Sequence, residues 1–142
     1  MADERPVLDQ VNLVVSDMDA SLAFYRRVGV DIPDQMPQWD PHHRSANVAG
    51  GLQFFLDSAR FARDWNEGSR GPACVVGFKL ASNEAVDALY ADLTGAGYRG
   101  QQAPYNAFWG SRYAVVEDPD GNLVGLMSPI DAALRRDVEP PP

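Results

Sequence analysis

The chain has 142 residues, 45% of them hydrophobic, which is enough for one domain or two small fused modules around a buried core. Twelve Lys and Arg residues against 20 Asp and Glu residues give a net charge of −8, which argues against a nucleic acid partner because such binding needs clustered cations. No apolar run approaches the roughly 20 residues of a membrane span, and the start "MADERPVLDQ" lacks the features of a signal peptide. We therefore expect a cytoplasmic protein without a membrane partner.

The first half of the chain predicts a strand, a helix and further short strands. Strand alternation over residues 11–15 puts the apolar Val11, Leu13 and Val15 on one face, which is typical of a half-buried strand. A helix follows, with Ser16 or Asp17 as its N-cap and Gly29 where it ends. Gly and Pro then separate three strand candidates, at 30–33, 44–49 and 52–57. Residues 59–72 are expected to be a linker, with one helical turn around Phe61 and Trp65.

The second half repeats this order. A strand at 76–80 precedes a helix capped by Ser82 or Asn83 and ended at Gly95 or Gly97. The strand candidates that follow are 100–105, 111–117 and 122–128, with the turn "DPDG" between the last two. The tail, 131–142, is expected to hold a short helix at 131–137 and to be partly disordered.

An internal repeat connects the halves. Residues 10–25 match residues 75–90 at an offset of 65, and the identical positions are Val11 with Val76, Ala20 with Ala85, Ala23 with Ala88 and Tyr25 with Tyr90. The repeated unit is β-α-β-β-β. We therefore predict the α+β class, with a module at 7–58 and a module at 73–130 inside a single domain, 1–130.

Each helix can cover only one face of its sheet, so the other face is left for a ligand cavity. Strand alternation puts Gln10 and Asn12 on that face. The further positions predicted there are Leu52, Phe54 and Leu56, then Val75, Gly77 and Lys79, then Leu123, Gly125 and Met127. A mainly apolar surface with a few amides suits a small-molecule site. The alternative is that Gln10 and Asn12 only satisfy each other within the sheet.

Two segments resemble the vicinal oxygen chelate superfamily, which includes glyoxalase I, bleomycin-resistance proteins and extradiol dioxygenases. They are "LDQVNLVVSDMDASLAFYRRVGV" and "FWGSRYAVVEDPDGNLVGLMSP", and the resemblance spans about residues 7–130. It implies that the two modules form a cupped, mostly antiparallel sheet. It also implies a homodimer, which would cover the edge strands.

The resemblance further marks the positions from which metal-dependent members take their ligands. Here they are Gln10, Phe54, Val75 and Gly125, and only Gln10 offers a donor atom. We therefore expect no metal and no cofactor. Gly125 either leaves room in the cup or relieves backbone crowding.

Other candidate site residues are aromatic. Trp39 and His43 lie in one loop region, and a second region supplies Tyr105, Phe108, Trp109 and Tyr113. Flat rings at a cavity mouth can stack on a planar ligand, although the same rings could fill a core or a dimer interface. His42 and His43 are adjacent, so on a strand they point to opposite faces and cannot chelate together.

The expected function is metal-independent binding of a small hydrophobic or aromatic molecule rather than catalysis. The resemblance to metal-free drug-binding members implies sequestration of a drug or natural product, as in antibiotic resistance. The alternative is a lyase, isomerase or dioxygenase of the glyoxalase type. It would need either a metal, with a different strand register, or an acid or base such as Lys79 or Glu117.

Overall fold

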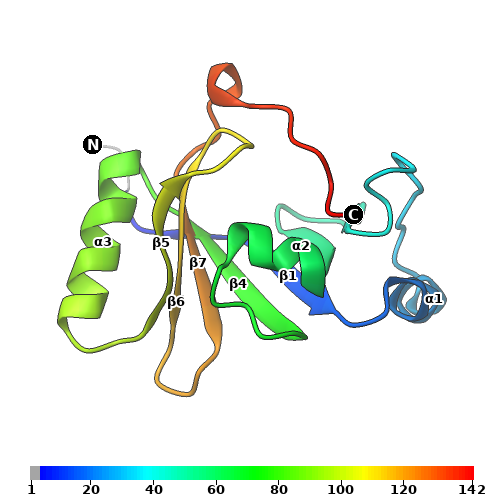
Figure 1. Cartoon of the computed structure of the whole chain (residues 1–142), viewed down its shortest axis with the longest axis horizontal. Helices are drawn as coiled ribbons and strands as arrows, with labels where there is room; N and C mark the ends of the chain where they lie inside the picture. The colour runs from blue at the N-terminus through cyan, green and yellow to red at the C-terminus, as the bar shows by residue number, and fades with distance from the viewer. Residues whose placement is uncertain (1–3) are drawn as a thin grey trace.

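Seven strands form one curled sheet in the computed structural model, which describes residues 4–142 (Figure 1). Their order across the sheet is β2-β3-β1-β4-β7-β6-β5. The strands are β1 (Val7–Val15), β2 (His43–Ser45), β3 (Gln53–Ser58), β4 (Ala73–Lys79), β5 (Gly100–Asn106), β6 (Arg112–Glu117) and β7 (Leu123–Met127). The helices are α1 (Met18–Val28), α2 (Ala59–Trp65), α3 (Asn83–Gly95) and the 3-10 turn η1 (Ala132–Leu134).

The strand pairing confirms the α+β class and the internal repeat. The second module is β-α-β-β-β, and the first has two strands, β2 and β3, after its helix. β1 and β4 join the modules in antiparallel register, and Val11 lies opposite Val76, the residue to which the repeat matched it. Within the modules, β1 pairs with β3 and β4 pairs with β7, both in parallel. The other three strand pairs of the described sheet are antiparallel. The centre of the repeat therefore lies at the Val11–Val76 pair.

One predicted strand is wrong, because residues 30–33 contribute only an isolated bridge between Asp31 and Asn47. Pro33 has no N–H for a ladder. The Arg26 side chain donates to the carbonyl oxygen of Ile32, and Arg44 donates to that of Pro33 at 3.2 Å. These carbonyls therefore bind guanidinium groups instead of a neighbouring strand.

Local side-chain contacts fix the ends of the two long helices. Asp17 caps α1 by accepting a hydrogen bond from the Ala20 N–H at 3.0 Å, and Ser82 caps α3 through the Ala85 N–H at 3.1 Å. Gly29 ends α1 in the left-handed region, with φ of 110°. The sequence had offered two candidates for each cap, and the structure selects one of each.

The two long helices cover the outer face of the sheet. Leu22 of α1 packs with Leu56 of β3, and Val86 of α3 packs with Leu126 of β7. The inner face is left concave, and α2 packs into it. The side chains of α2 that reach this inner core are Phe61, Ala62 and Trp65. The predicted linker therefore contains a seven-residue helix, begun by Ser58, that forms part of the cup wall.

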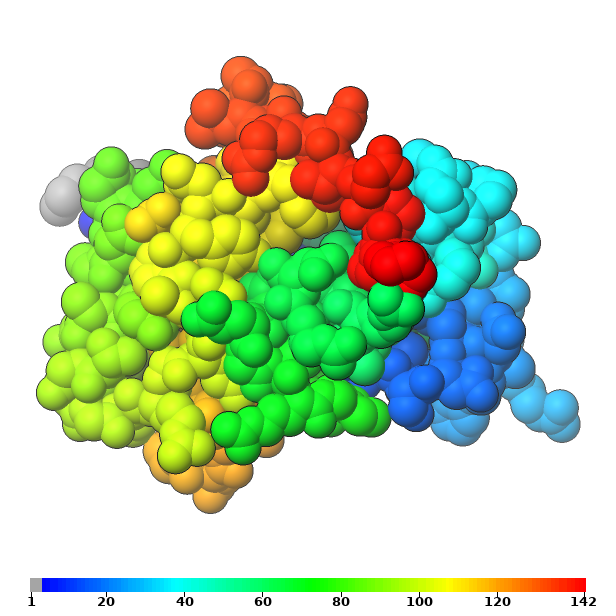
Figure 2. All heavy atoms as spheres, in the orientation of Figure 1, coloured from blue at the N-terminus to red at the C-terminus, as the bar shows by residue number. Residues whose placement is uncertain are grey.

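The tail, residues 131–142, forms a strap that runs across the opening of the cup (Figures 1 and 2). The expected helix at 131–137 is reduced to η1. The backbone N–H of Asp131 donates to the carbonyl oxygen of Gly110 at 2.9 Å, and that of Arg136 donates to the carbonyl oxygen of Phe108 at 2.8 Å. In Figure 2 the strap bridges the second-module side and the loop before β2.

Across residues 4–142, no helix combines the length and the apolar character needed to cross a bilayer.

Candidate ligand-binding site

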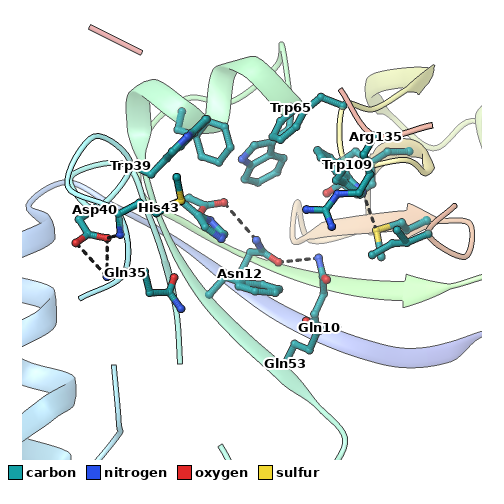
Figure 3. A pocket seen from close by; sticks show the side chains of 18 residues that line it. Gln10, Asn12, Gln35, Trp39, Asp40, His43, Gln53, Trp65, Trp109 and Arg135 are labelled. Atoms are coloured by element: carbon teal, nitrogen blue, oxygen red, sulfur yellow. Dashed lines mark hydrogen bonds and ion pairs between the residues drawn. The ribbon is translucent and has the colours of Figure 1, made fainter. Parts of the chain in front are cut away.

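A cavity of about 370 Å³ occupies the cup (Figure 3), within the size range of small-molecule sites. Its walls come from β1, β2 and β3 of the first module, from β6 and β7 of the second, from α2 and the strap, and from the loops before β2 and between β5 and β6. The cavity is therefore formed within one chain. Seven of the predicted site residues line it: Gln10, Asn12, Trp39, His43, Phe108, Trp109 and Tyr113.

A chain of hydrogen bonds forms the polar floor of the cavity. The Gln10 side chain donates to Asn12 Oδ1 at 2.8 Å, and Asn12 Nδ2 donates to Asp57 Oδ2 at 3.3 Å. His43 Nδ1 lies 2.5 Å from the other oxygen, Asp57 Oδ1. Gln10 and Asn12 therefore bond to each other, as the alternative interpretation had it, and also line the cavity.

The floor depends on Asp57, which is buried to 1% exposure. An ionised carboxylate only accepts hydrogen bonds, so Nδ1 of His43 is the donor in this pair. The other ring nitrogen, Nε2, lies 3.4 Å from the Ser45 hydroxyl, which is longer than most O–H···N contacts. His43 is thus oriented by a buried carboxylate, and its second nitrogen is not engaged in a short hydrogen bond with Ser45.

The predicted inward face of β3 is wrong by one residue. Phe54 points to the outer face, where its ring packs edge-on against Tyr25 at 5.4 Å, and Leu56 belongs to the same outer cluster. The residues of β3 that line the cavity are Gln53, Phe55 and Asp57. A shift of one residue reverses every side chain of a strand, and two adjacent phenylalanines give no alternation that would fix the choice.

Aromatic rings form the wall opposite the floor. The rings of Trp39 and Phe108 stack with centroids 6.3 Å apart and 23° between their planes. Phe61 meets Trp39 edge-on at 5.2 Å, and Trp109 meets Tyr113 at the same distance. The chain has three tryptophans, and all of them line the cavity.

Two predicted site residues, Tyr105 and Gly125, lie behind this wall and not among the lining residues. The Tyr105 hydroxyl donates to the backbone carbonyl of Trp65 at 3.2 Å. A Cβ on Gly125 would be 2.8 Å from the hydroxyl oxygen of Tyr113. The missing side chain of Gly125 therefore makes room for Tyr113 and not for a ligand.

Tyr113, which is buried, and Tyr105, which is half-buried, both remain protonated at neutral pH. Burial raises the pKa of Tyr113 far above its ordinary value, and the nearby Tyr105 and Asp57 raise it further. Burial also raises the pKa of Tyr105, with a smaller contribution from Asp64. Neither hydroxyl can act as a base near pH 7.

The polar side chains considered for other roles lie elsewhere. Lys79 pairs with Asp9 at 3.3 Å, and Glu117 lies 3.9 Å from Arg99; neither Lys79 nor Glu117 lines the cavity. Arg112, next to the aromatic segment, pairs with Asp87 at 2.8 Å.

The donor set does not fit the metal site that the resemblance marks. With the register of β3 corrected, the four marked positions are Gln10, Phe55, Val75 and Gly125, which together offer a single amide side chain. In the part of the chain that the structure describes, residues 4–142, no three His, Cys, Asp or Glu side chains gather as a metal site would require. His43 and Asp57 are hydrogen-bonded to each other.

Sequence reasoning missed Asp57, Phe61, Trp65 and Arg135 as cavity residues. A carboxylate at the end of the apolar run "LQFFLD" was the available signal for Asp57. The helical spacing of Phe61 and Trp65 was the signal for α2. Arg135 lies in the tail, and nothing in the local sequence connects it with the cup.

Comparison with known proteins agrees with this architecture. The family model of the Glyoxalase/Bleomycin resistance protein/Dioxygenase superfamily matches residues 7–126. Among curated protein sequences none matches the chain.

Similar solved structures are a Mn(II)-bound glyoxalase from Novosphingobium aromaticivorans, an NAD-dependent benzaldehyde dehydrogenase from Legionella pneumophila and a methylmalonyl-CoA epimerase from Mycobacterium tuberculosis. The first is 20% identical with a TM-score of 0.61, and the match covers 96% of this chain and 43% of that one. The second is 19% identical with a TM-score of 0.60, over 84% and 96% of the two chains. The third is 20% identical with a TM-score of 0.57, over 94% and 95%. At these identities the likeness shows the fold alone. With the family model matched over most of its length, the chain belongs to the Glyoxalase/Bleomycin resistance protein/Dioxygenase superfamily.

Proposed function

We propose that this protein binds a small, planar, largely apolar molecule in the cup without a metal, and that it sequesters this molecule. The observation that carries the proposal is the cavity wall, where Trp39 and Phe108 stack at 6.3 Å and the other two tryptophans also face the cavity. Rigid rings offer contact area at a low entropic cost, and the amides of Gln10 and Asn12 can orient one polar group of the ligand.

Intrinsic fluorescence provides the test, because every tryptophan lines the cavity. Titration with naphthalene-2-carboxamide should quench the emission and saturate at one molecule per chain. Phe108→Ala should weaken the binding by roughly three- to tenfold, which is the usual contribution of an aromatic pair. Phe24→Ala is the matched control, since Phe24 lies on α1 and is 61% exposed. A Phe108 variant that binds as well as the wild type would contradict this site.

Sequestration of a drug or natural product is the biological form of this proposal, supported by the resemblance to metal-free drug-binding members. Expression of the wild-type chain should then raise a host's tolerance to a planar natural-product antibiotic that quenches its tryptophans, and the Phe108 variant should lose that effect. The homodimer stays a prediction, which light scattering of the purified protein will check.

A second candidate is metal-independent acid–base catalysis, and the His43–Asp57 pair favours it specifically. A histidine held by a buried carboxylate through Nδ1 can use Nε2 as a base toward a molecule in the cavity. Exchange of deuterium from solvent into 2-acetylnaphthalene, a planar ketone with acidic C–H bonds, would reveal such a base. Exchange that His43→Gln abolishes would favour catalysis, whereas binding without exchange would favour sequestration.

A further inference from the structure

We propose that Arg135, carried on the strap, binds an anionic group of the ligand, so that the cup selects planar aromatic acids over their neutral analogues. This inference rests on the proposed ligand-binding function of the cup and assigns the chemical class of the ligand. Arg135 belongs to the strap and lies outside the repeat, the sheet and the floor of the cavity.

The charges around the cavity carry the argument. Asp57 accepts hydrogen bonds from Asn12 and His43. Asp40 accepts bonds from the backbone N–H groups of Gln35 and Met36, at 3.2 and 3.1 Å. Both carboxylates that line the cavity are therefore matched by partners from the protein itself.

Arg135 differs from these carboxylates. It lines the same cavity, and Figure 3 shows its side chain reaching in beside Trp109. Among residues 4–142, no hydrogen bond or ion pair joins its guanidinium group to another side chain or to the backbone. The unmatched charge of the cavity is therefore positive. A guanidinium group binds a carboxylate through two parallel hydrogen bonds, which combine charge with a fixed geometry.

The strap is held where this side chain reaches the cavity. Arg136 Nη2 donates to the carbonyl oxygen of Asn106 at 3.0 Å, in addition to the two backbone bonds of the strap. Gly110 allows the close approach, because a Cβ there would overlap with the carbonyl oxygen of Asp131 and lie 3.3 Å from Arg135 Cγ. Arg135 is therefore presented from a docked segment.

The positions of the partners define the ligand. The aromatic wall takes a flat ring system, the floor offers neutral amides, and Arg135 enters beside Trp109. A rigid aromatic body with one carboxylate satisfies all three, while a neutral analogue leaves the guanidinium unmatched.

The test compares two probes of the same shape, naphthalene-2-carboxylate and naphthalene-2-carboxamide, by tryptophan quenching. We expect the wild type to prefer the carboxylate by about tenfold, the usual difference for a charge-assisted hydrogen bond. Arg135→Gln should remove this preference by lowering the affinity for the carboxylate about tenfold relative to that for the amide, whereas Arg135→Lys should keep part of the preference. Arg27→Gln is the control, because it changes the net charge equally from the end of α1.

Each outcome decides something different. Equal affinity of the wild type for both probes would overturn the anion site and leave the proposed function standing. A carboxylate preference that survives in Arg135→Gln would also overturn it, since another group would then hold the anion. Binding of neither probe would count against the proposed function itself, and with it against this inference.

Discussion

Equivalent strands of the two modules carry opposite chemistry. Positions related by the repeat are Gln10 with Val75 and Asn12 with Gly77. The neighbouring strands continue the contrast, because Asp57 lies beside Val14 just as Met127 lies beside Lys79, the repeat partner of Val14. On these strands the first half of the cup is mainly polar and the second is apolar. A repeated backbone therefore does not repeat a site, and a metal needing donors from both halves would find none on these strands of the second half.

Two glycines of the second half leave space for side chains that pack directly over their Cα atoms. A Cβ at Gly77 would lie 2.6 Å from Gln10 Cγ, and a Cβ at Gly125 would lie 2.8 Å from the Tyr113 hydroxyl. The missing side chains of Gly77 and Gly125 thus allow Gln10 and Tyr113 to take their positions. The charge on this side of the cup comes from the strap.

The largest effect on stability should come from replacing Asp57 of the polar half with methionine, the residue at the equivalent position of the apolar half. Asp57→Met removes a buried carboxylate and leaves His43 and Asn12 without their acceptor, so it should lower the free energy of unfolding by about 2–3 kcal/mol. Chemical denaturation measures this. Asp92→Met, on the exposed face of α3, is the control and should stay within about 0.5 kcal/mol of the wild type. A similarly small change for Asp57→Met would mean that the polar floor does not stabilise the fold.

A second change adds a side chain to the apolar half. Gly125→Ala should cost about 1–3 kcal/mol of folding free energy, because the new methyl group meets the buried Tyr113 hydroxyl. Adding Tyr113→Phe removes the contacting oxygen and should recover part of the loss. A double-mutant cycle from denaturation curves checks this coupling. Strictly additive effects would show that the close contact between the two residues is not the cause.

A third change separates the strap from the cup. Gly110 has φ of 100°, so Gly110→Ala should cost about 1 kcal/mol of stability through backbone strain and should displace the strap, abolishing the preference for naphthalene-2-carboxylate. Gly121→Ala is a matched control. Gly121 has φ of 86°, but the nearest atom to a Cβ there is 3.6 Å away. The Gly121→Ala variant should lose stability and keep the preference for the carboxylate probe. Loss of this preference in both variants would point to a general effect of backbone strain.

The smallest effect concerns alkaline pH and the buried wall. The pKa of Tyr113 is raised in the folded protein, so the unfolded chain loses this proton first, and the associated stability is lost as pH rises above the ordinary value of 10. Between pH 10 and 11, Tyr113→Phe should lose about 1 kcal/mol less stability than the wild type. Parallel pH profiles of denaturation would contradict burial of this hydroxyl.

Much of this protein could be predicted from local sequence. The offset of 65 residues gave the repeat and the fold class, and alternation in β1 gave the inward side chains Gln10 and Asn12. Each helix start was predicted to within one residue, and the structure selected Asp17 and Ser82 as the caps. The helix starts and the inward face of β1 depend on residues a few positions apart, so periodicity and capping chemistry are sufficient to find them. The repeat instead requires comparison of the whole chain with itself.

The tertiary structure alone decided the rest. The inward face of β3 depends on its register with β1, and adjacent Phe54 and Phe55 are interchangeable to any local pattern. The pairing of His43 with Asp57 and the placement of Arg135 join segments that only the curled sheet and the docked strap bring together. Local sequence determined most of the elements, because helix caps and strand alternation are local, but it also predicted a strand at 30–33 and a helix at 131–137, which the structure reduces to an isolated bridge and a 3-10 turn. Which side chains meet across the cup was decided by strand pairing and packing between distant parts of the chain.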